Sequence, residues 1–352
     1  MAANGRPRGE GTFCGPGGEG SAFSAFSRPG SFPLDPSDPS ASSLGRPLSL
    51  TKRLTCGLDR LMQRCASEEE GQQEEGGEGL MQDQAGFLVL PAAASQGVGA
   101  HRPVVLGGRY RVVRLLGMGT FAQTVECEDE LTSHRVAVKV LREGFGEVGR
   151  REAVLLHALR RSPGFSAACV VRGHSLFSAG PHACIAMEVL AQPLPHYLRS
   201  IRPFSLPMGV MQKLTMQLTT ALSFLSANGV VHADLRPENV LVCLSRRSSD
   251  GLLAGESEGL RVRLADFGNG MALGPDGSLD CGGADVQTLP YRAPEAILGL
   301  PLTAAIDAWS LGCLVMEVFM GRRLLNPYSA SSALTTMART LGPLPAELSG
   351  GR

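Results

Sequence analysis

Lysine is nearly missing from this sequence, which has 33 basic residues but only Lys52, Lys139 and Lys213 among them. The formal net charge is zero, which argues against a polyanion such as nucleic acid as the main partner. No apolar run is long enough to span a membrane, and residues 1–30 lack the apolar core of a secretory signal. Nine cysteines without regular spacing indicate neither a disulfide framework nor a zinc site. These absences predict an intracellular, reduced protein of the cytoplasm, the nucleus or both.

Residues 1–108 are poor in aromatic side chains and rich in Gly, Pro, Ser, Ala and Glu, which predicts a largely disordered arm. Leucines at helical spacing within it have two interpretations. One is a short helix that docks a protein partner; the other, which we favour because short isolated helices are marginal in water, is a transient solvated helix. These leucines are Leu50, Leu54, Leu58 and Leu61. The polar insertion 245–259 predicts a surface loop, with a regulatory site as the alternative.

The pattern changes at Arg109, where strands and then helices are predicted. A strand-rich lobe over 109–190 is followed by a helix-rich lobe over 191–352, so the fold class is α+β with two lobes and a cleft between them. The predicted strands are Tyr110–Leu116, Gln123–Cys127, Arg135–Leu141, Cys169–Arg172 and Ala183–Leu190. The predicted helices are Arg150–Leu159 and a long one that Pro207 opens and that runs to Asn228.

The stretch His232–Asn239 has the residue types that phosphoryl transfer needs. Asp234 can accept a proton from an attacking hydroxyl, Arg236 can lie against the transferred phosphate, and the Asn239 amide can hold a metal ion. The stretch alone is compatible with chance or with a small-molecule phosphotransferase. The flanking sequence decides between these readings.

Two glycines, Gly117 and Gly119, let the backbone approach a phosphate, although two glycines in a hairpin are more often only a tight turn. Twenty residues after Gly119, Lys139 lies in an apolar strand where an unpaired cation is costly. Glu152 on the next helix is its predicted partner. A lysine in a chain that otherwise uses arginine indicates that a compact ammonium is needed there.

Asp266 and Gly268 follow the predicted strand Arg261–Leu264. A carboxylate at a strand end can hold magnesium together with Asn239, whereas the commoner role of Asp near Gly is an Asx turn. The order and spacing relative to Asp234 favour the metal ligand.

These stretches together resemble protein kinases: the catalytic loop at Asp234, the strand lysine at Lys139, the Asp-Phe-Gly motif at Asp266, Ala293-Pro294-Glu295, and the buried acid at Asp307. The resemblance implies ATP, Mg²⁺ and protein substrates. It assigns catalysis to Asp234, Lys139, Arg236 and Asn239, and metal binding to Asn239 and Asp266. It assigns the nucleotide site to Leu116, Gly117, Met118, Gly119, Thr120, Phe121, Ala122, Gln123, Thr124, Lys139, Glu152, Glu188 and Leu190. It also implies that Asp307 braces the catalytic loop.

Details of the motifs are similar to the CMGC group, and most to the homeodomain-interacting and dual-specificity tyrosine-regulated kinases. In that branch the residue after the catalytic-loop histidine is often not arginine, as with Ala233 here. The branch implies a serine/threonine kinase, with dual specificity as an option. Ala122 and Thr124 depart from the usual nucleotide loop and motivate an alternative, a pseudokinase scaffold. The tyrosine that the branch has before Ala293 is missing, and Asp285 is expected to supply a permanent negative charge.

The resemblance also implies a longer large lobe than the sequence after Arg109 supplies, so the lobe is expected to be incomplete at its C-terminus. Glu295 is then expected to lack its arginine partner, and the helix faces around Trp309 and Met316 are expected to form an apolar patch.

Overall fold

The computed structural model describes residues 82–90, 103–201, 206–243, 260–279, 281, 285–343 and 345. The leucine-bearing stretch Leu50–Leu61 and the insertion 245–259 lie outside the described residues, so both interpretations of each stay open. Within the described residues, no helix has the length and apolarity needed to cross a bilayer.

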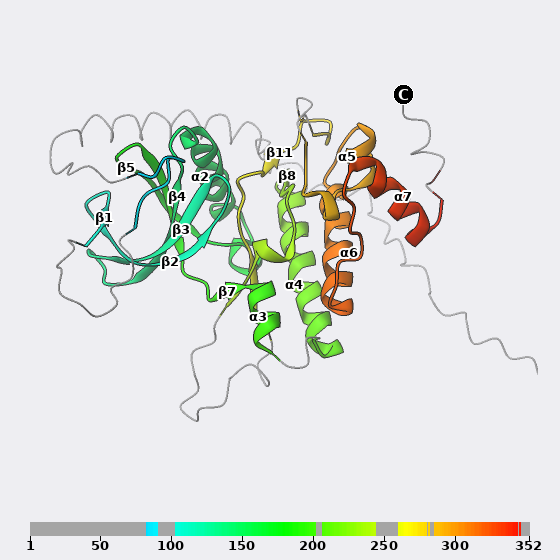
Figure 1. Cartoon of the computed structure of the whole chain (residues 1–352), viewed down its shortest axis with the longest axis horizontal. Coiled ribbons are helices and arrows are strands. Elements are labelled where there is room, and N and C mark those ends of the chain that lie inside the picture. The colour runs from blue at the N-terminus through cyan, green and yellow to red at the C-terminus, as the bar shows by residue number, and fades with distance from the viewer. Residues whose placement is uncertain are drawn as a thin grey trace, which may run out of the picture. The chain divides into compact units, whose positions relative to one another are not determined.

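A six-stranded antiparallel sheet forms the first lobe, in the order β1-β2-β3-β4-β6-β5 (Figure 1). Its strands are β1 Val105–Leu106, β2 Tyr110–Met118, β3 Ala122–Asp129, β4 Arg135–Leu141, β5 Gly173–Ala179 and β6 His182–Glu188. Four of the five predicted strands in this lobe are confirmed, with ends that shift by a few residues. The predicted strand Cys169–Arg172 is wrong: Val170 forms only an isolated bridge with Leu264. Val170 and Val171 are buried without strand pairing, so their apolarity reflects burial alone.

Side chains alternate between the two faces of this sheet. Val125, Val138 and Cys184 point to the outer face, where Leu106 and Leu88 complete a buried cluster. The lobe therefore begins before the predicted boundary at 109, because β1 and part of 82–90 cover apolar surface that would otherwise meet water.

The inner face packs against α2 Gly146–Arg160, which confirms the predicted helix and starts four residues earlier. Gly149 allows this close packing, since a Cβ there would lie 2.8 Å from Leu141 Cγ. The short 3-10 helix Phe165–Ala167 follows α2.

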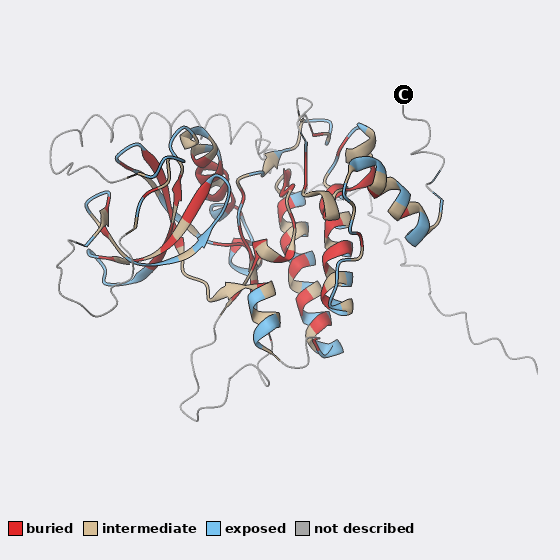
Figure 2. Ribbon diagram, viewed as in Figure 1, coloured by how far each residue is buried: buried red, intermediate tan, exposed pale blue. Residues whose placement is uncertain are grey.

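The second lobe is mainly helical, and the two-lobed α+β architecture is as predicted. α4 begins directly after Pro207, as expected, and its buried residues Met211, Leu214 and Leu218 recur every three to four positions. Figure 2 shows such buried stripes on α4 and α6, which run side by side. The helices are α3 Leu194–Ser200, α4 Met208–Ala227, α5 Pro294–Leu298, α6 Ala305–Met320 and α7 Ala330–Leu341.

Two small sheets and two 3-10 turns carry the loops of this lobe. The sheets have the orders β10-β9-β7 and β11-β8. Their strands are β7 Gln192–Pro193, β8 Val230–Val231, β9 Val240–Val242, β10 Val262–Leu264 and β11 Met271–Ala272, and the turns are Pro237–Asn239 and Leu289–Tyr291.

Candidate active site

A buried carboxylate on α6 holds the loop that follows β8. Asp307 of α6 accepts hydrogen bonds from the backbone N–H groups of His232 at 2.7 Å and Ala233 at 3.0 Å. Ala233 has a φ of 61°, which is uncommon for a residue with a Cβ, so the two bonds fix an otherwise unfavourable backbone. Burial raises the pKa of the Asp307 carboxyl, and His232 and the N–H donors oppose that shift. The predicted contact between Asp307 and the loop is present.

The Asp234 carboxylate lies between an amide and a hydroxyl. Asn239 Nδ2 donates to Asp234 Oδ2 at 3.2 Å and to its backbone carbonyl at 2.8 Å. Thr288 Oγ1 donates to Asp234 Oδ1 at 2.7 Å. Sequence reasoning missed Thr288; the only available signal was a hydroxyl residue shortly before Ala293. These contacts fix the direction of the Asp234 carboxylate, and the residue is partly exposed.

His232 joins this loop to Asp266. Its Nδ1 accepts from the Asp234 N–H at 3.3 Å, so Nε2 is the nitrogen that donates to the Ala265 carbonyl at 3.0 Å. The edge of the imidazole packs on the Phe267 ring with centroids 4.8 Å apart. Ala265 N–H also donates to the Asn239 carbonyl, so Asn239 and Asp266 are brought to neighbouring positions.

Lys139 of β4 links the two lobes. Its Nζ lies 2.6 Å from Glu152 Oε2 on α2 and 2.7 Å from Asp266 Oδ1. The other Glu152 oxygen accepts from the Phe267 N–H at 3.2 Å. The predicted contact with Glu152 is present, whereas the contact with Asp266 was not predicted. Asp266 has a φ of 64°, and this conformation directs its carboxylate back towards Lys139.

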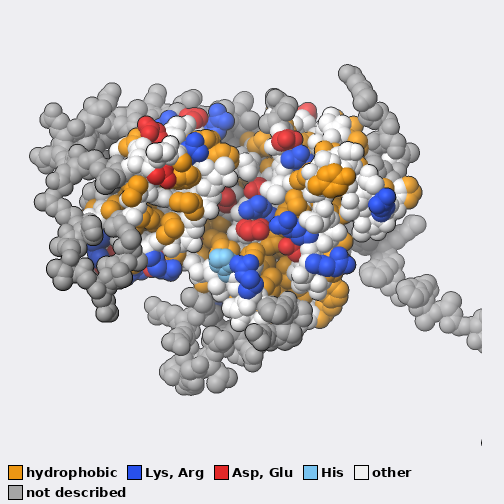
Figure 3. Space-filling view, in the orientation of Figure 1, with side chains coloured by type: hydrophobic (Ala, Val, Ile, Leu, Met, Phe, Trp, Pro, Cys, Tyr) orange, Lys and Arg blue, Asp and Glu red, His pale blue; other side chains and the backbone are white. Residues whose placement is uncertain are grey.

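The three ionisable groups shift one another's pKa values. Burial opposes the charged form of Lys139, but Glu152 and Asp266 outweigh it and raise the lysine pKa. Burial raises the pKa of Glu152, against the pull of Lys139. Asp266 is also desolvated, yet Lys139 lowers its pKa. One ammonium and two carboxylates carry a net negative charge when ionised, which favours a further cation. In Figure 3, acidic and basic side chains lie side by side near the middle of the face shown.

The residues around this cluster fit a magnesium ion. The Asp266 side chain is half exposed, and the Asn239 amide donates its N–H to Asp234 and keeps a carbonyl oxygen outside the described hydrogen bonds. Within the described residues, no group of three or more His, Cys, Asp or Glu is arranged around a metal position. Magnesium commonly takes one or two protein oxygens and completes its shell with phosphate and water, so Asn239 and Asp266 suffice.

The glycine loop leaves room for a phosphate. Gly119 N–H donates to the Ala122 carbonyl at 2.8 Å and closes the turn between β2 and β3. A Cβ on Gly117 would meet no atom within 4 Å, so this strand presents bare backbone. Gly117 and Gly119 both have negative φ, so turn geometry does not require glycine at either position. Thr124 pairs with Lys139 across the strands and shares its face.

The remaining residues that were predicted to form the nucleotide site lie in different environments. Leu116 and Leu190 pack against the main core, Ala122 is buried, and Met118, Thr120 and Phe121 are exposed around the turn. Gln123, which was assigned to the nucleotide site, has its side chain on the outer face, where it donates to the Leu88 carbonyl at 3.0 Å, because neighbouring strand residues alternate in direction. The Glu188 side chain accepts from the Arg172 N–H at 2.8 Å.

Arg236 lies with its own loop and is not in a described contact with Asp234. Its Nε is 3.4 Å from Glu238 Oε2, and the side chain is about one-third exposed. The side chain therefore has a local partner and access to solvent.

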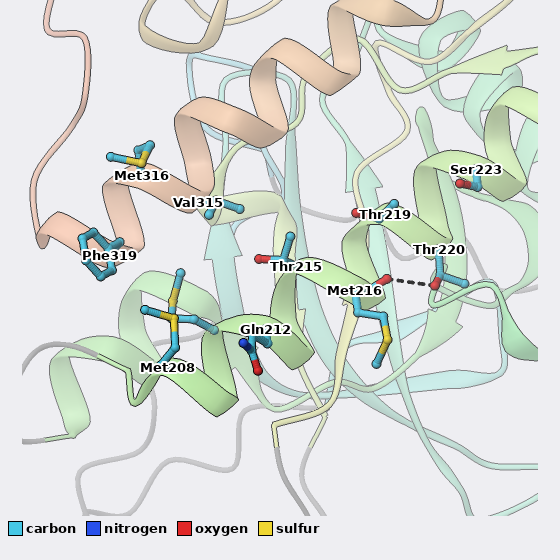
Figure 4. Close-up of a pocket in the computed structure, with 11 residues that line it drawn as sticks. Met208, Gln212, Thr215, Met216, Thr219, Thr220, Ser223, Val315, Met316 and Phe319 are labelled. Atoms are coloured by element: carbon cyan, nitrogen blue, oxygen red, sulfur yellow. Dashed lines mark hydrogen bonds between the residues drawn. The ribbon is translucent and has the colours of Figure 1, made fainter. Parts of the chain in front are cut away.

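A pocket lies between α4 and α6, away from these residues (Figure 4). It has a volume of about 710 Å³ and its lining is mostly apolar. Its residues are Met208, Met211, Gln212, Thr215, Met216, Thr219, Thr220, Ser223, Val315, Met316 and Phe319. The expected exposure of Met316 is confirmed, whereas Trp309 is partly buried between two clusters. Glu295 is half-buried, and its side chain has no ion pair within the described residues.

Comparison with known proteins agrees with this geometry. The family model described as protein kinase domain matches residues 110–342. Homeodomain-interacting protein kinase 1 of Caenorhabditis elegans is 32% identical over 246 residues, which cover 69% of this chain and 27% of that protein. The Mus musculus protein of the same name is 34% identical over 68% of this chain and 18% of its own length.

Dual specificity protein kinase lkh1 of Schizosaccharomyces pombe is 33% identical over 67% of this chain and 34% of its own length. The chain thus spans between about a fifth and a third of the length of these curated relatives. The matched residues span both lobes, and these relatives include kinases of the branch that the motifs predicted.

Proposed function

The chain belongs to the protein kinase domain family, and on this premise we propose that it is an active serine/threonine kinase that uses ATP and Mg²⁺. The observation that carries the proposal is Lys139, whose ammonium contacts Glu152 and Asp266 together. Strand β4, helix α2 and the loop that follows β10 thereby meet at one atom. Together with Asp234 and the Asn239 amide that contacts it, this arrangement supports phosphate transfer as well as nucleotide binding.

Each residue has a distinct role in the proposed reaction. Lys139 binds nucleotide phosphate as a compact cation, and Glu152 holds the lysine in place. Asp234 orients the acceptor hydroxyl and takes its proton, while Asn239 keeps the carboxylate directed. Magnesium, held by Asp266 and Asn239, neutralises phosphate charge when it is bound.

The proposed preference for serine and threonine is supported by Thr288. Its aliphatic hydroxyl reaches Asp234 Oδ1 at 2.7 Å, so the space beside the carboxylate accommodates a short side-chain alcohol. A substrate serine or threonine can approach the same carboxylate in the same manner. One similar protein is named a dual specificity protein kinase. Phosphate transfer to a substrate tyrosine would contradict a preference for serine and threonine alone.

The competing function is a nucleotide-binding scaffold without transfer, suggested by Ala122 and Thr124. Ala122 is buried in the turn and Thr124 stands opposite Lys139, so both act on nucleotide affinity rather than on proton transfer. Lys139, Asp234, Asn239 and Asp266 all keep their contacts. The active enzyme is therefore the better-supported function.

A radiolabelled-ATP assay on a generic basic protein with magnesium tests the proposal. Asp234→Asn should lower turnover by a factor of about 10² to 10⁴, because the base is lost, and should leave nucleotide binding in place. The exposed Glu130→Gln is the matched carboxylate-to-amide control and should match the wild type. A wild type that is stabilised by ATP and magnesium but transfers no phosphate would instead be the scaffold.

A further inference from the structure

Part of the arm lies against the outer face of the sheet. Leu88 is 3% exposed within the outer cluster, and its carbonyl accepts from Gln123 Nε2 at 3.0 Å. Asp83 holds the preceding turn, since its Oδ1 accepts from the N–H groups of Ala85 and Phe87, both at 2.9 Å. The segment 82–90 therefore has a defined conformation and a buried anchor beside the first residues of β3.

The same segment contacts the linker Arg142–Phe145, which joins β4 to α2. The Glu143 N–H donates to the Gly86 carbonyl at 3.1 Å. The Arg142 guanidinium lies over the Phe87 ring, 5.7 Å from its centroid, and over the Phe145 ring at 5.2 Å. Arg142 is thus stacked between one ring of the arm and one ring of the linker.

The linker in turn holds the glycine loop. Arg142 N–H donates to the Phe121 carbonyl at 2.9 Å. The Phe121 ring packs against Phe145 with centroids 5.0 Å apart. Phe121 is about half exposed and stands in the turn after Gly119, so this contact is its main restraint at the tip of the loop.

The linker also sets the start of α2. Phe145 is the N-cap of the helix, and its carbonyl accepts from the Gly149 N–H at 3.3 Å. Glu152 lies less than one turn further and contacts Lys139. Movement of the linker would therefore reach both the phosphate loop and the lysine partner.

We propose that segment 82–90 is a brace that orders the glycine loop and the start of α2 for ATP binding, with Arg142 as its positioning residue. The proposal rests on the proposed kinase function and adds a part of the arm to the nucleotide site. None of these side chains touches the reacting atoms. Without the brace, a smaller fraction of the molecules would have the glycine loop in its binding-competent form. The apparent affinity for ATP would fall in proportion to that fraction.

Phe87 separates this role from simple stability. Leu88 carries the buried apolar contact, whereas Phe87 is only half-buried and its described ring contact is with Arg142. Phe87→Ala should therefore leave the folded lobe intact while it releases the guanidinium. Val89, the exposed neighbour, gives a matched truncation, Val89→Ala, on the other side of the segment.

The test uses the full chain and measures KM for ATP and kcat. Phe87→Ala and Arg142→Ala should each raise the KM for ATP by about two- to fivefold, the size of one exposed cation–π contact, with kcat nearly unchanged. Phe87→Tyr keeps the ring and Arg142→Lys keeps the charge, so both should recover most of the affinity. Val89→Ala should behave as the wild type.

Two results overturn the brace: an unchanged KM in Phe87→Ala and Arg142→Ala, or an equal rise in Val89→Ala. Hydrogen exchange of residues 117–123 separates this outcome from a failure of the kinase proposal. If the wild type transfers no phosphate, the kinase proposal fails, but faster exchange in Phe87→Ala than in Val89→Ala would still support the brace. Equal exchange in all three proteins would reject it.

Discussion

Asp129 and Asp266 each meet a cation in or next to the six-stranded sheet, but the two carboxylates are used differently. The Asp129 carboxylate accepts hydrogen bonds from Nε and Nη2 of Arg109, at 2.7 Å each. It also accepts from the Thr132 hydroxyl and the Leu131 N–H. Its side chain is 5% exposed, whereas that of Asp266 is 50% exposed and meets Lys139 through one oxygen. The first pair is closed; the second keeps an oxygen accessible.

The difference explains why this arginine-rich chain keeps one lysine in its sheet. A planar guanidinium matches one carboxylate and saturates it, which suits the hairpin that Asp129 holds. An ammonium can be shared between Glu152 and Asp266 and still point towards a phosphate. Closed pairs therefore add stability, and open pairs leave capacity for a ligand.

Of the substitutions in these two ion pairs, Lys139→Arg should give the largest effect. The fork would displace Glu152 or Asp266 by about 1 Å, and such a misplacement costs roughly a hundredfold in kcat/KM. The melting temperature should change little, because a cation remains. Lys213→Arg is the matched control, since that exposed lysine lies on α4. Near-normal turnover in Lys139→Arg would contradict the role given to the ammonium.

Asp129→Ala should instead lower stability. Arg109 would keep a charge without its partner, but its side chain is 39% exposed and water can solvate it, so the free energy of unfolding should fall by about 1 to 2 kcal/mol. The urea midpoint should fall, while the KM for ATP of the folded fraction stays the same. Glu130→Ala at the exposed neighbouring position should have little effect. Lost turnover at unchanged stability in Asp129→Ala would erase the distinction between the two pairs.

The closed pair also predicts a pH dependence. The hydrogen bonds from Arg109 lower the pKa of Asp129 in the folded state below its ordinary value of 3.8. Its contribution is therefore fully present above pH 3.8 and is lost as the pH falls through the lower pKa of the folded state. The difference in melting temperature between the wild type and Asp129→Asn should shrink from about pH 5 downwards. A difference that grows on acidification would reverse the assignment.

Asp285→Ala should have a small effect on the rate. Asp285 Oδ1 lies 2.9 Å from Arg292 Nη1, but its side chain is 88% exposed, and Arg292 is held separately by the Gln287 carbonyl. An exposed pair is weak, so the phosphorylation rate should fall by about fivefold at most. Elevated salt should reduce the difference between the two proteins. An unchanged rate would remove the basis for Asp285 as a permanent negative charge in this segment.

Phosphatase treatment should leave the rate nearly unchanged. Tyr291, the only tyrosine between Asp266 and Glu295, is 2% exposed and donates to Glu317 at 2.6 Å. A kinase or phosphatase cannot reach that hydroxyl without opening the segment. A large loss of activity after treatment would mean that a phosphate elsewhere takes part.

The sequence by itself determined four strands of the first lobe, the helices α2 and α4, and the order of the motifs. The run of apolar and β-branched residues in Arg135–Leu141 and the apolar spacing of three to four residues after Pro207 are local signals, and burial follows from them directly. The pairing of Lys139 with Glu152 was also predictable, because a cation in an apolar strand needs a partner nearby. The apolar patch at Met316 was likewise predicted, although Trp309 is covered more than expected.

Only the tertiary structure decided which groups meet across long separations. Thr288 reaches Asp234, and Asp266 reaches Lys139, because a left-handed backbone and the packing of two lobes bring them together. Gln123 faces the outer side because one register places every second side chain there, and a sequence pattern does not say which face meets which partner. The segment 82–90 is the clearest case: its composition predicted disorder, and a single buried leucine with a few backbone bonds fixed it on the sheet.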